Sequence, residues 1–170
     1  EFAKATGTLA TDEARLLRGF GESVCQHWQL PDHGIWEIRG EPRQYTFSKV
    51  MCWTALDALI DLAEHGLLKL PPGARHARAA LREQIEARGY NRAAGSYVGV
   101  LDGTAVDASL LLMGCLGYAD PADARMRGTF ASVHARLARN GLLMRYEHGF
   151  DGFDAPEGAF GICSYWAIDN

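Results

Sequence analysis

Three connecting segments of the sequence place aromatic rings beside carboxylates and arginines. They span residues 29–42, 89–103 and 140–156. Their chemically relevant side chains are Trp36, Glu37 and Arg39 in the first, Tyr90, Arg92 and Tyr97 in the second, and Arg145, Tyr146 and Glu147 in the third. Aromatic rings cover the apolar faces of sugars, while charged groups bind the sugar hydroxyls. The segments therefore predict a carbohydrate site, and hydrolysis of a glycosidic bond by paired carboxylates is the chemistry that we expect there.

The helical segments that position these loops are predicted to be of two kinds. One kind has apolar side chains on a single face and spans residues 11–28, 74–88 and 121–139, with Thr11 as the expected N-cap of the first. The other kind is apolar around nearly its whole circumference and spans residues 43–64, 104–116 and 157–168. A helix that is apolar all round is buried on all sides, whereas an amphipathic helix has one face in water. The chain therefore alternates outer and inner helices.

This alternation predicts an all-α fold with two concentric layers of helices. About three helical hairpins of this kind make an arc of an (α/α)6 toroid, and we expect residues 1–170 to form a single, partial domain of that architecture. The inner-to-outer connections are short, at residues 65–73 and 117–120, whereas the outer-to-inner connections are the three long segments. In an alternating toroid the long segments all emerge at one end, so they are expected to gather on one face. Long loops in a compact domain are more often functional than idle.

Composition narrows the classes of function. The chain has 170 residues, of which 48% are hydrophobic, and its 17 basic and 21 acidic side chains give a net charge of −4. The basic residues are scattered, so we expect no nucleic-acid partner. No apolar run approaches the roughly 20 residues that cross a bilayer, so we expect no membrane association. The four cysteines lie far apart in apolar helical segments, which indicates buried thiols and a reducing, cytoplasmic location.

Five segments together form a longer signature. They read GIWEIRG at 34–40, YTFSKVMCW at 45–53, DASLLL at 107–112, GLLMRY at 141–146 and EGAFGICSYW at 157–166. In this order they resemble the bacterial branch of glycoside hydrolase family 15, which contains glucoamylases, glucodextranases and trehalases. The resemblance covers essentially the whole chain, and the Trp-Glu loop followed by the Ser-Lys helix is its most specific part.

The resemblance implies an (α/α)6 barrel that hydrolyses α-glucosidic bonds with inversion. It implies that Glu37 is the general acid that protonates the leaving oxygen, a role that needs a carboxyl protonated near neutral pH, which packing against Trp36 in a drying cleft would favour. Trp36 would form a wall of the subsite at the scissile bond, and Arg145 with Tyr146 would hold hydroxyls of the terminal glucose. For Arg39, Lys49 and Glu157 the resemblance implies only proximity to the pocket. Trehalose and maltodextrins both remain open as substrates, and no cofactor is implied.

The chain also departs from the family pattern. Family members have six helical hairpins, whereas this sequence supplies about three. Family members also have an upstream Arg-Asp motif and a late Glu-Glu loop that carries the general base, and this sequence matches neither. We therefore expect an interior fragment of a longer enzyme, whose missing barrel or a second copy of the chain covers its apolar flanks. The alternative is a non-catalytic carbohydrate-binding or scaffold arc.

Some residues keep a structural interpretation beside the functional one. Lys49 begins an otherwise apolar helix, so burial with a carboxylate is an alternative to substrate contact. Arg145 as a surface residue and Glu157 as a first-turn residue favoured by the helix dipole are alternatives of the same kind. The six histidines show no helical zinc-site spacing, and we expect no metal.

Overall fold

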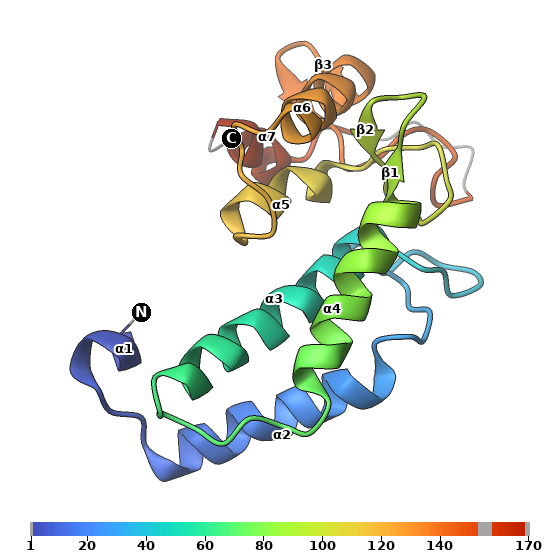
Figure 1. The fold of residues 1–170 in the computed structure, drawn as a ribbon. Coiled ribbons are helices and arrows are strands. Elements are labelled where there is room, and N and C mark those ends of the chain that lie inside the picture. Colours follow the sequence, from blue (N-terminus) through green and yellow to red (C-terminus); the bar gives the residue numbers. More distant parts are fainter. Residues whose placement is uncertain (1, 153–157, 169–170) are drawn as a thin grey trace. The chain divides into compact units, whose positions relative to one another are not determined.

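The computed structural model describes residues 2–152 and 158–168 and is mostly helical (Figure 1). Its α-helices are α1 (Phe2–Thr6), α2 (Thr11–His27), α3 (Thr46–Glu64), α4 (Ala74–Gln84), α5 (Leu112–Cys115), α6 (Ala124–Leu137) and α7 (Gly161–Ile168). A π-helical turn (Ile85–Gly89) extends α4, and a 3-10 helix (Ala108–Leu111) precedes α5. Two short antiparallel hairpins complete the fold, β1 (Tyr90–Asn91) with β2 (Ser96–Tyr97) and β3 (Ala138–Arg139) with β4 (Leu142–Leu143).

The chain divides into two compact units. Unit 1 consists of Glu1–Leu30 and Met51–Glu83, and unit 2 of Pro31–Val50 and Gln84–Asn170. The expectation of a single domain stays a prediction. The three long connecting segments lie almost wholly in unit 2, so unit 2 is where a site built from them must form.

In unit 1, α2, α3 and α4 lie side by side (Figure 1). The apolar α3 supplies much of the buried core, with Leu56 fully buried and Leu59 and Ile60 only 5% and 4% exposed. The buried Gly21 lets α2 approach α3 closely, because a Cβ at position 21 would stand 2.5 Å from Cδ1 of Leu59 in α3. The sequence therefore places a glycine where the two helices leave no room for a side chain.

In unit 2, α6 packs on the β1–β2 hairpin and α7 on β4. The hydroxyls of Tyr97 and Tyr118 donate to Oε1 of Glu86, at 2.9 and 2.7 Å, and Arg125 binds the other oxygen of the same carboxylate. Thr129 Oγ1 accepts the backbone N–H of Tyr97 at 3.0 Å. This partly buried polar network joins α6 to the hairpin that begins the second connecting segment.

Most predicted helices are present, with different boundaries. Ala10, and not Thr11, is the N-cap of α2, because the Glu13 carboxylate accepts the Ala10 N–H at 3.1 Å. A helix was predicted from residue 104, but residues 104–107 are not helical. Asp107 is extended and caps the helix that starts at Ala108. The predicted inner helix 157–168 is observed from Gly161, since Ala159 pairs with Met144 in a β-bridge.

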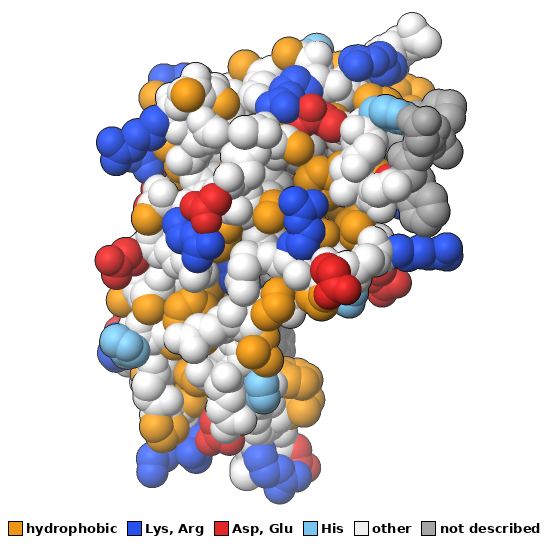
Figure 2. All heavy atoms as spheres, turned by 90° about the vertical axis from the view of Figure 1, so that its right-hand side faces the viewer, with side chains coloured by type: hydrophobic (Ala, Val, Ile, Leu, Met, Phe, Trp, Pro, Cys, Tyr) orange, Lys and Arg blue, Asp and Glu red, His pale blue; other side chains and the backbone are white. Residues whose placement is uncertain are grey.

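The surface is mixed in character. On the face in Figure 2, basic side chains are interspersed with acidic and hydrophobic ones. Among the described residues, no helix combines the length and apolarity that spanning a membrane requires. No disulfide joins the four cysteines, all of which lie among the described residues, and the expectation of burial is confirmed for Cys163 but wrong for the exposed Cys115.

Candidate functional site

Glu37 lies at the tip of a tight turn in unit 2. Its backbone has φ +49°, a left-handed conformation that residues other than glycine seldom adopt. The Glu37 N–H donates to the carbonyl of Gly34 at 3.2 Å, which closes the turn. The Glu37 side chain is exposed. Strain of this kind persists only where the surroundings impose it, and it is frequent at functional sites.

The surroundings do impose it, through a brace at the base of the loop. Asp32 Oδ1 accepts the Gly34 N–H at 2.6 Å and the Ser48 hydroxyl at 2.8 Å, which ties the loop to the first turn of α3. Asp32 and Arg43 also pair through two backbone hydrogen bonds, of 2.9 and 2.8 Å. Gly34 has φ +67° and packs against the Tyr45 ring, which a Cβ would approach to 3.0 Å. The loop that carries Glu37 is thus held at both ends.

Trp36 and Ile38, the neighbours of Glu37, anchor the turn on an apolar cluster. Ile38 is 7% exposed and packs with Tyr45 and Tyr146, which are 2% and 4% exposed, and Trp36 packs against the same cluster. Because the residues on both sides point into the protein, Glu37 is the one presented to solvent. The described residues do not enclose it, so the drying cleft expected for a general acid is not formed by them alone.

Beside this turn lies a group of rings around a guanidinium, which we call the Arg145 cluster: Arg145, Trp36, Tyr146, Phe160 and Trp166. The Arg145 guanidinium carbon lies 5.0 Å from the ring centre of Tyr146, 5.7 Å from that of Phe160 and 5.9 Å from that of Trp36. Trp36 also contacts Phe160 and Trp166, at centroid distances of 6.1 and 5.9 Å. A planar guanidinium held among aromatic faces suits the recognition of sugar hydroxyls beside apolar sugar faces.

Asp107 lies under this cluster and is almost completely buried, at 2% exposure. Its Oδ1 accepts the Ser109 N–H at 2.7 Å and the Ser109 hydroxyl. The indole N–H of Trp36 is buried without a hydrogen bond of good geometry, and Asp107 is the carboxylate with which it interacts. Burial raises the pKa of the Asp107 carboxyl, while Ser109 and then the Trp36 indole act in the opposite direction.

The three connecting segments meet here, as their sequence predicted. Ile38 of the first segment and Val100 of the second belong to one apolar cluster. Just after the first segment, Tyr45 pairs with Val100, and the Thr46 N–H donates to the carbonyl of Gly99 at 3.0 Å. Phe150, from the third segment, packs on Tyr45 at 6.2 Å and stacks on Tyr146 at 5.4 Å. The second and third segments have secondary structure of their own, because the second contains the β1–β2 hairpin and the third contains β4.

The structure separates the predicted site residues into groups. Glu37, Trp36, Arg145 and Tyr146 come together, and Arg39 is exposed two residues beyond Glu37. Two environments were predicted for Lys49, burial and substrate contact. Its side chain is 1% exposed, so the structure shows burial. Glu157 lies outside the described residues.

Sequence reasoning did not single out Phe160, Trp166 or Asp107 as site residues. Phe160 and Trp166 read as parts of an apolar helix. Asp107 lies two residues before Ser109, which is the spacing of an N-cap residue and the residue that it caps. This spacing was the available signal in the sequence for Asp107.

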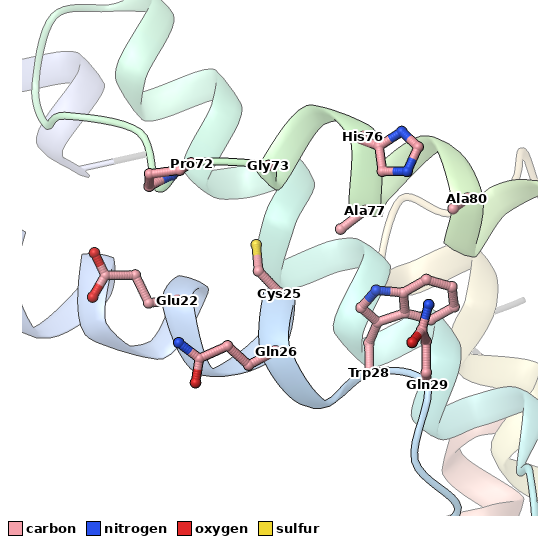
Figure 3. A pocket seen from close by; sticks show the side chains of 10 residues that line it. All are labelled: Glu22, Cys25, Gln26, Trp28, Gln29, Pro72, Gly73, His76, Ala77 and Ala80. Carbon is pink, nitrogen blue, oxygen red and sulfur yellow. The ribbon is translucent and has the colours of Figure 1, made fainter.

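A cavity lies elsewhere, in unit 1 (Figure 3). It is an open groove of about 590 Å³ between the end of α2, with Trp28 and Gln29, and the start of α4, with His76. A second cavity, of about 330 Å³, adjoins the apolar cluster in unit 2 and is bordered by Arg43, His148 and Phe150. Within the described part of the chain, no group of three or more His, Cys, Asp or Glu side chains is arranged to hold a metal ion.

Comparison with known proteins identifies the family. Residues 9–170 match the sequence profile described as Glycosyl hydrolases family 15. The chain belongs to this family. Trehalase from Mycolicibacterium smegmatis is 37% identical over 156 residues, and trehalase from Mycobacterium tuberculosis is 38% identical over 150 residues. The matches cover 90% and 86% of this chain but only 23% and 22% of the two relatives, so the chain spans less than a quarter of their length.

Solved structures share the fold of this chain. A glycosidase variant in complex with glucose superposes with a TM-score of 0.73 at 22% identity, over 85% of this chain and 38% of that protein. A wild-type glycosidase gives a TM-score of 0.72 at 22% identity, with the same coverage. The likeness shows a shared fold, and the predicted arc of an (α/α)6 barrel is confirmed.

Proposed function

We propose that this family 15 chain is part of an inverting hydrolase that releases glucose from an α-linked glucoside, with trehalose as the first substrate to test. The observation that carries the proposal is the strained, braced turn that presents Glu37 beside the Arg145 cluster. The family 15 relatives named trehalase favour trehalose over the maltodextrins, which the sequence had left equally open.

In this proposal Glu37 is the general acid. Its carboxyl protonates the glycosidic oxygen as the bond to the anomeric carbon breaks, a contribution of roughly 10²- to 10⁴-fold in enzymes. The braced backbone supports this role, because a proton donor acts efficiently only when it is held within hydrogen-bond reach of the oxygen. The bound substrate and the remaining barrel would supply the exclusion of water that the described residues do not.

The Arg145 cluster would bind the sugar. The guanidinium donates to hydroxyls, while Trp36 and the 46%-exposed Phe160 offer ring surface for the sugar's apolar face. Tyr146 is 4% exposed, so we assign it to orienting Arg145 rather than to direct contact. Arg39 and Glu157 remain proposed neighbours of the pocket.

The general base lies, in this proposal, outside the chain. An inverting mechanism needs a second carboxylate roughly 6.5 to 9.5 Å from the first to activate water. The relatives are more than four times longer than the matched region, so the rest of such a protein would supply the base and cover the exposed side of α7, where Ile162 and Tyr165 are 49% and 70% exposed. Pairing of two copies of the chain is the alternative cover. The four cysteines, which no disulfide joins, favour a reducing location, which we propose is the cytoplasm.

The test is turnover of trehalose and maltose by the full-length protein that contains this chain. We expect Glu37→Gln to lower kcat for trehalose by about 10²- to 10⁴-fold. Glu41→Gln is the matched control, because Glu41 is an exposed carboxylate in the same loop; it should leave kcat within about twofold. Equal, small effects of the two substitutions would exclude Glu37 as the acid. Sugar binding without any hydrolysis by the wild type would favour the alternative of a binding or scaffold arc.

Inversion has its own test in the same reaction. Inverting hydrolysis of trehalose releases one β-glucose from the cleaved residue and one α-glucose from the leaving group, whereas retention releases two α-glucoses. Proton NMR in the first minutes, before mutarotation, should show equal amounts of both anomers. Initial release of α-glucose alone would contradict the proposed mechanism.

A further inference from the structure

A buried carboxylate below the pocket has no place in the reaction as described so far. Asp107 is 2% exposed, and the desolvation of a carboxylate costs free energy unless its oxygens are well bonded. Capping of the following helix uses only Oδ1, which accepts both hydrogen bonds from Ser109. A neutral asparagine would cap the helix equally well without burying a charge. The second oxygen, Oδ2, therefore needs another explanation.

The surroundings of Oδ2 point towards Trp36. The Trp36 indole N–H is buried and makes no hydrogen bond of good geometry among the described residues, and this carboxylate is the acceptor beside it. Gly99 leaves the space open, since a Cβ there would stand 2.9 Å from Oδ2. Because both lone pairs of Oδ1 are used by Ser109, Oδ2 is the oxygen left to accept the indole.

The backbone of Asp107 is joined to the other half of the pocket. Asp107 pairs with Tyr146 in an antiparallel bridge, and the N–H of Ala108 donates to the carbonyl of Arg145 at 2.8 Å. The Asp107 side chain thus lies beside the indole of Trp36, and the peptide group that follows Asp107 bonds to the backbone of Arg145.

We propose that Asp107 is a positioning residue, whose carboxylate holds the Trp36 indole in register with Arg145 and Tyr146. The inference rests on the proposed function, because it assigns Asp107 to the same site. It makes no contact with substrate and acts through Trp36. An amide side chain would not replace the Asp107 carboxylate, because only a carboxylate offers two accepting oxygens at this point.

Asparagine tests this directly. In Asp107→Asn one side-chain atom still accepts from Ser109, but the other becomes an NH₂ group that faces the indole N–H, and flipping the amide moves the conflict to Ser109. We expect kcat/KM for trehalose to fall about tenfold or more in the full-length protein. In the Trp36→Phe background, which has no indole N–H, the same substitution should change kcat/KM by less than about threefold, and the melting temperature should show coupling of the same sign.

Ser109→Ala is the matched control. It removes the hydroxyl bond to Oδ1 and leaves Oδ2 unchanged, so it should lower the melting temperature while kcat/KM stays within about threefold. If Ser109→Ala lowers kcat/KM as much as Asp107→Asn, or if the Asp107→Asn effect is the same with and without Trp36, the carboxylate is only a helix cap and the inference is overturned. If the Asp107→Asn variant does not fold, the variant that combines Asp107→Asn with Trp36→Phe must fold for the inference to stand, because it has no indole N–H to conflict with the amide.

The two proposals fail in different ways. Coupling in melting temperature between Asp107 and Trp36, in a protein that hydrolyses no α-glucoside, would refute the proposed function and leave the contact intact. A large loss of activity in Glu37→Gln, together with no coupling between Asp107 and Trp36, would refute only the positioning role.

Discussion

Two glycines of α2, two positions apart, are expected to respond to alanine in opposite directions. Gly19 is exposed, and a Cβ there has nothing within 4 Å. Gly21 is buried, and a Cβ there would stand 2.5 Å from Cδ1 of Leu59 and 2.9 Å from Cγ of Pro71. Both substitutions gain the same helix propensity, about 1 kcal/mol. The difference between them therefore measures packing alone.

The magnitude follows from these distances. Carbon atoms in contact prefer a separation of about 3.5 to 4.0 Å, so the Leu59 methyl must retreat by roughly 1 Å in Gly21→Ala. Leu59 is 5% exposed and has little space to move into, and overpacking of this kind costs about 1 to 3 kcal/mol. We expect Gly19→Ala to stabilise α2 by up to about 1 kcal/mol, and Gly21→Ala to be about 1 to 3 kcal/mol less stable than Gly19→Ala.

Hydrogen exchange of the α2 amides, followed by mass spectrometry on the full-length protein, reads this local stability. A third variant checks the cause. Leu59→Val removes the clashing methyl, so in the Gly21→Ala background it should cost less than in the wild type. Equal stabilisation by the two alanines, or an unchanged cost of Leu59→Val, would refute the close packing of α2 on α3.

Three further predictions concern unit 2. Burial, and then the Glu86 carboxylate, raise the pKa of Tyr97 above the ordinary value of about 10. The unfolded chain then loses this proton first, so stability should fall as pH rises above about 10, by up to about 1.4 kcal/mol per pH unit. Tyr97→Phe should flatten that fall in alkaline denaturation, unlike a change at the exposed Tyr165. Gly128→Ala should destabilise by about 1 to 3 kcal/mol in thermal unfolding, because its Cβ would meet a backbone carbonyl oxygen; a higher melting temperature would contradict this. Arg145→Lys should raise KM for trehalose about tenfold or more, since lysine has no planar fork; an unchanged KM would remove Arg145 from the sugar site.

The fold was largely predictable because helix periodicity is strong in this chain. The contrast between an α3 that is apolar all round and an amphipathic α2 survives in the structure, where the first supplies the core of unit 1. The boundary near Ala159 was not predictable, because it depends on a β-bridge to Met144, whereas at Asp107 the cap spacing to Ser109 was a local signal and only the bridge to Tyr146 was hidden. Such pairings join residues far apart in sequence, so no local pattern indicates them.

The site was predictable in part. Trp36, Glu37 and Arg145 stand out by residue type and by the family signature, and the structure brings them together. The strain at Glu37 and the burial of Asp107 were not foreseeable, because both arise from tertiary contacts. Lys49 shows the limit of a sequence argument, since its charge suggested a substrate contact as readily as the burial that is observed.

In the proposed function, Glu37 gives a proton to the leaving oxygen. The most direct test of this step compares trehalose with α-glucosyl fluoride, whose fluoride leaves with little need of a proton donor. Glu37→Gln should lose about 10²- to 10⁴-fold in kcat on trehalose but less than about tenfold on the fluoride. Equal losses on both substrates would mean that Glu37 acts on the fold or on sugar binding, and the assignment of the general acid would be contradicted.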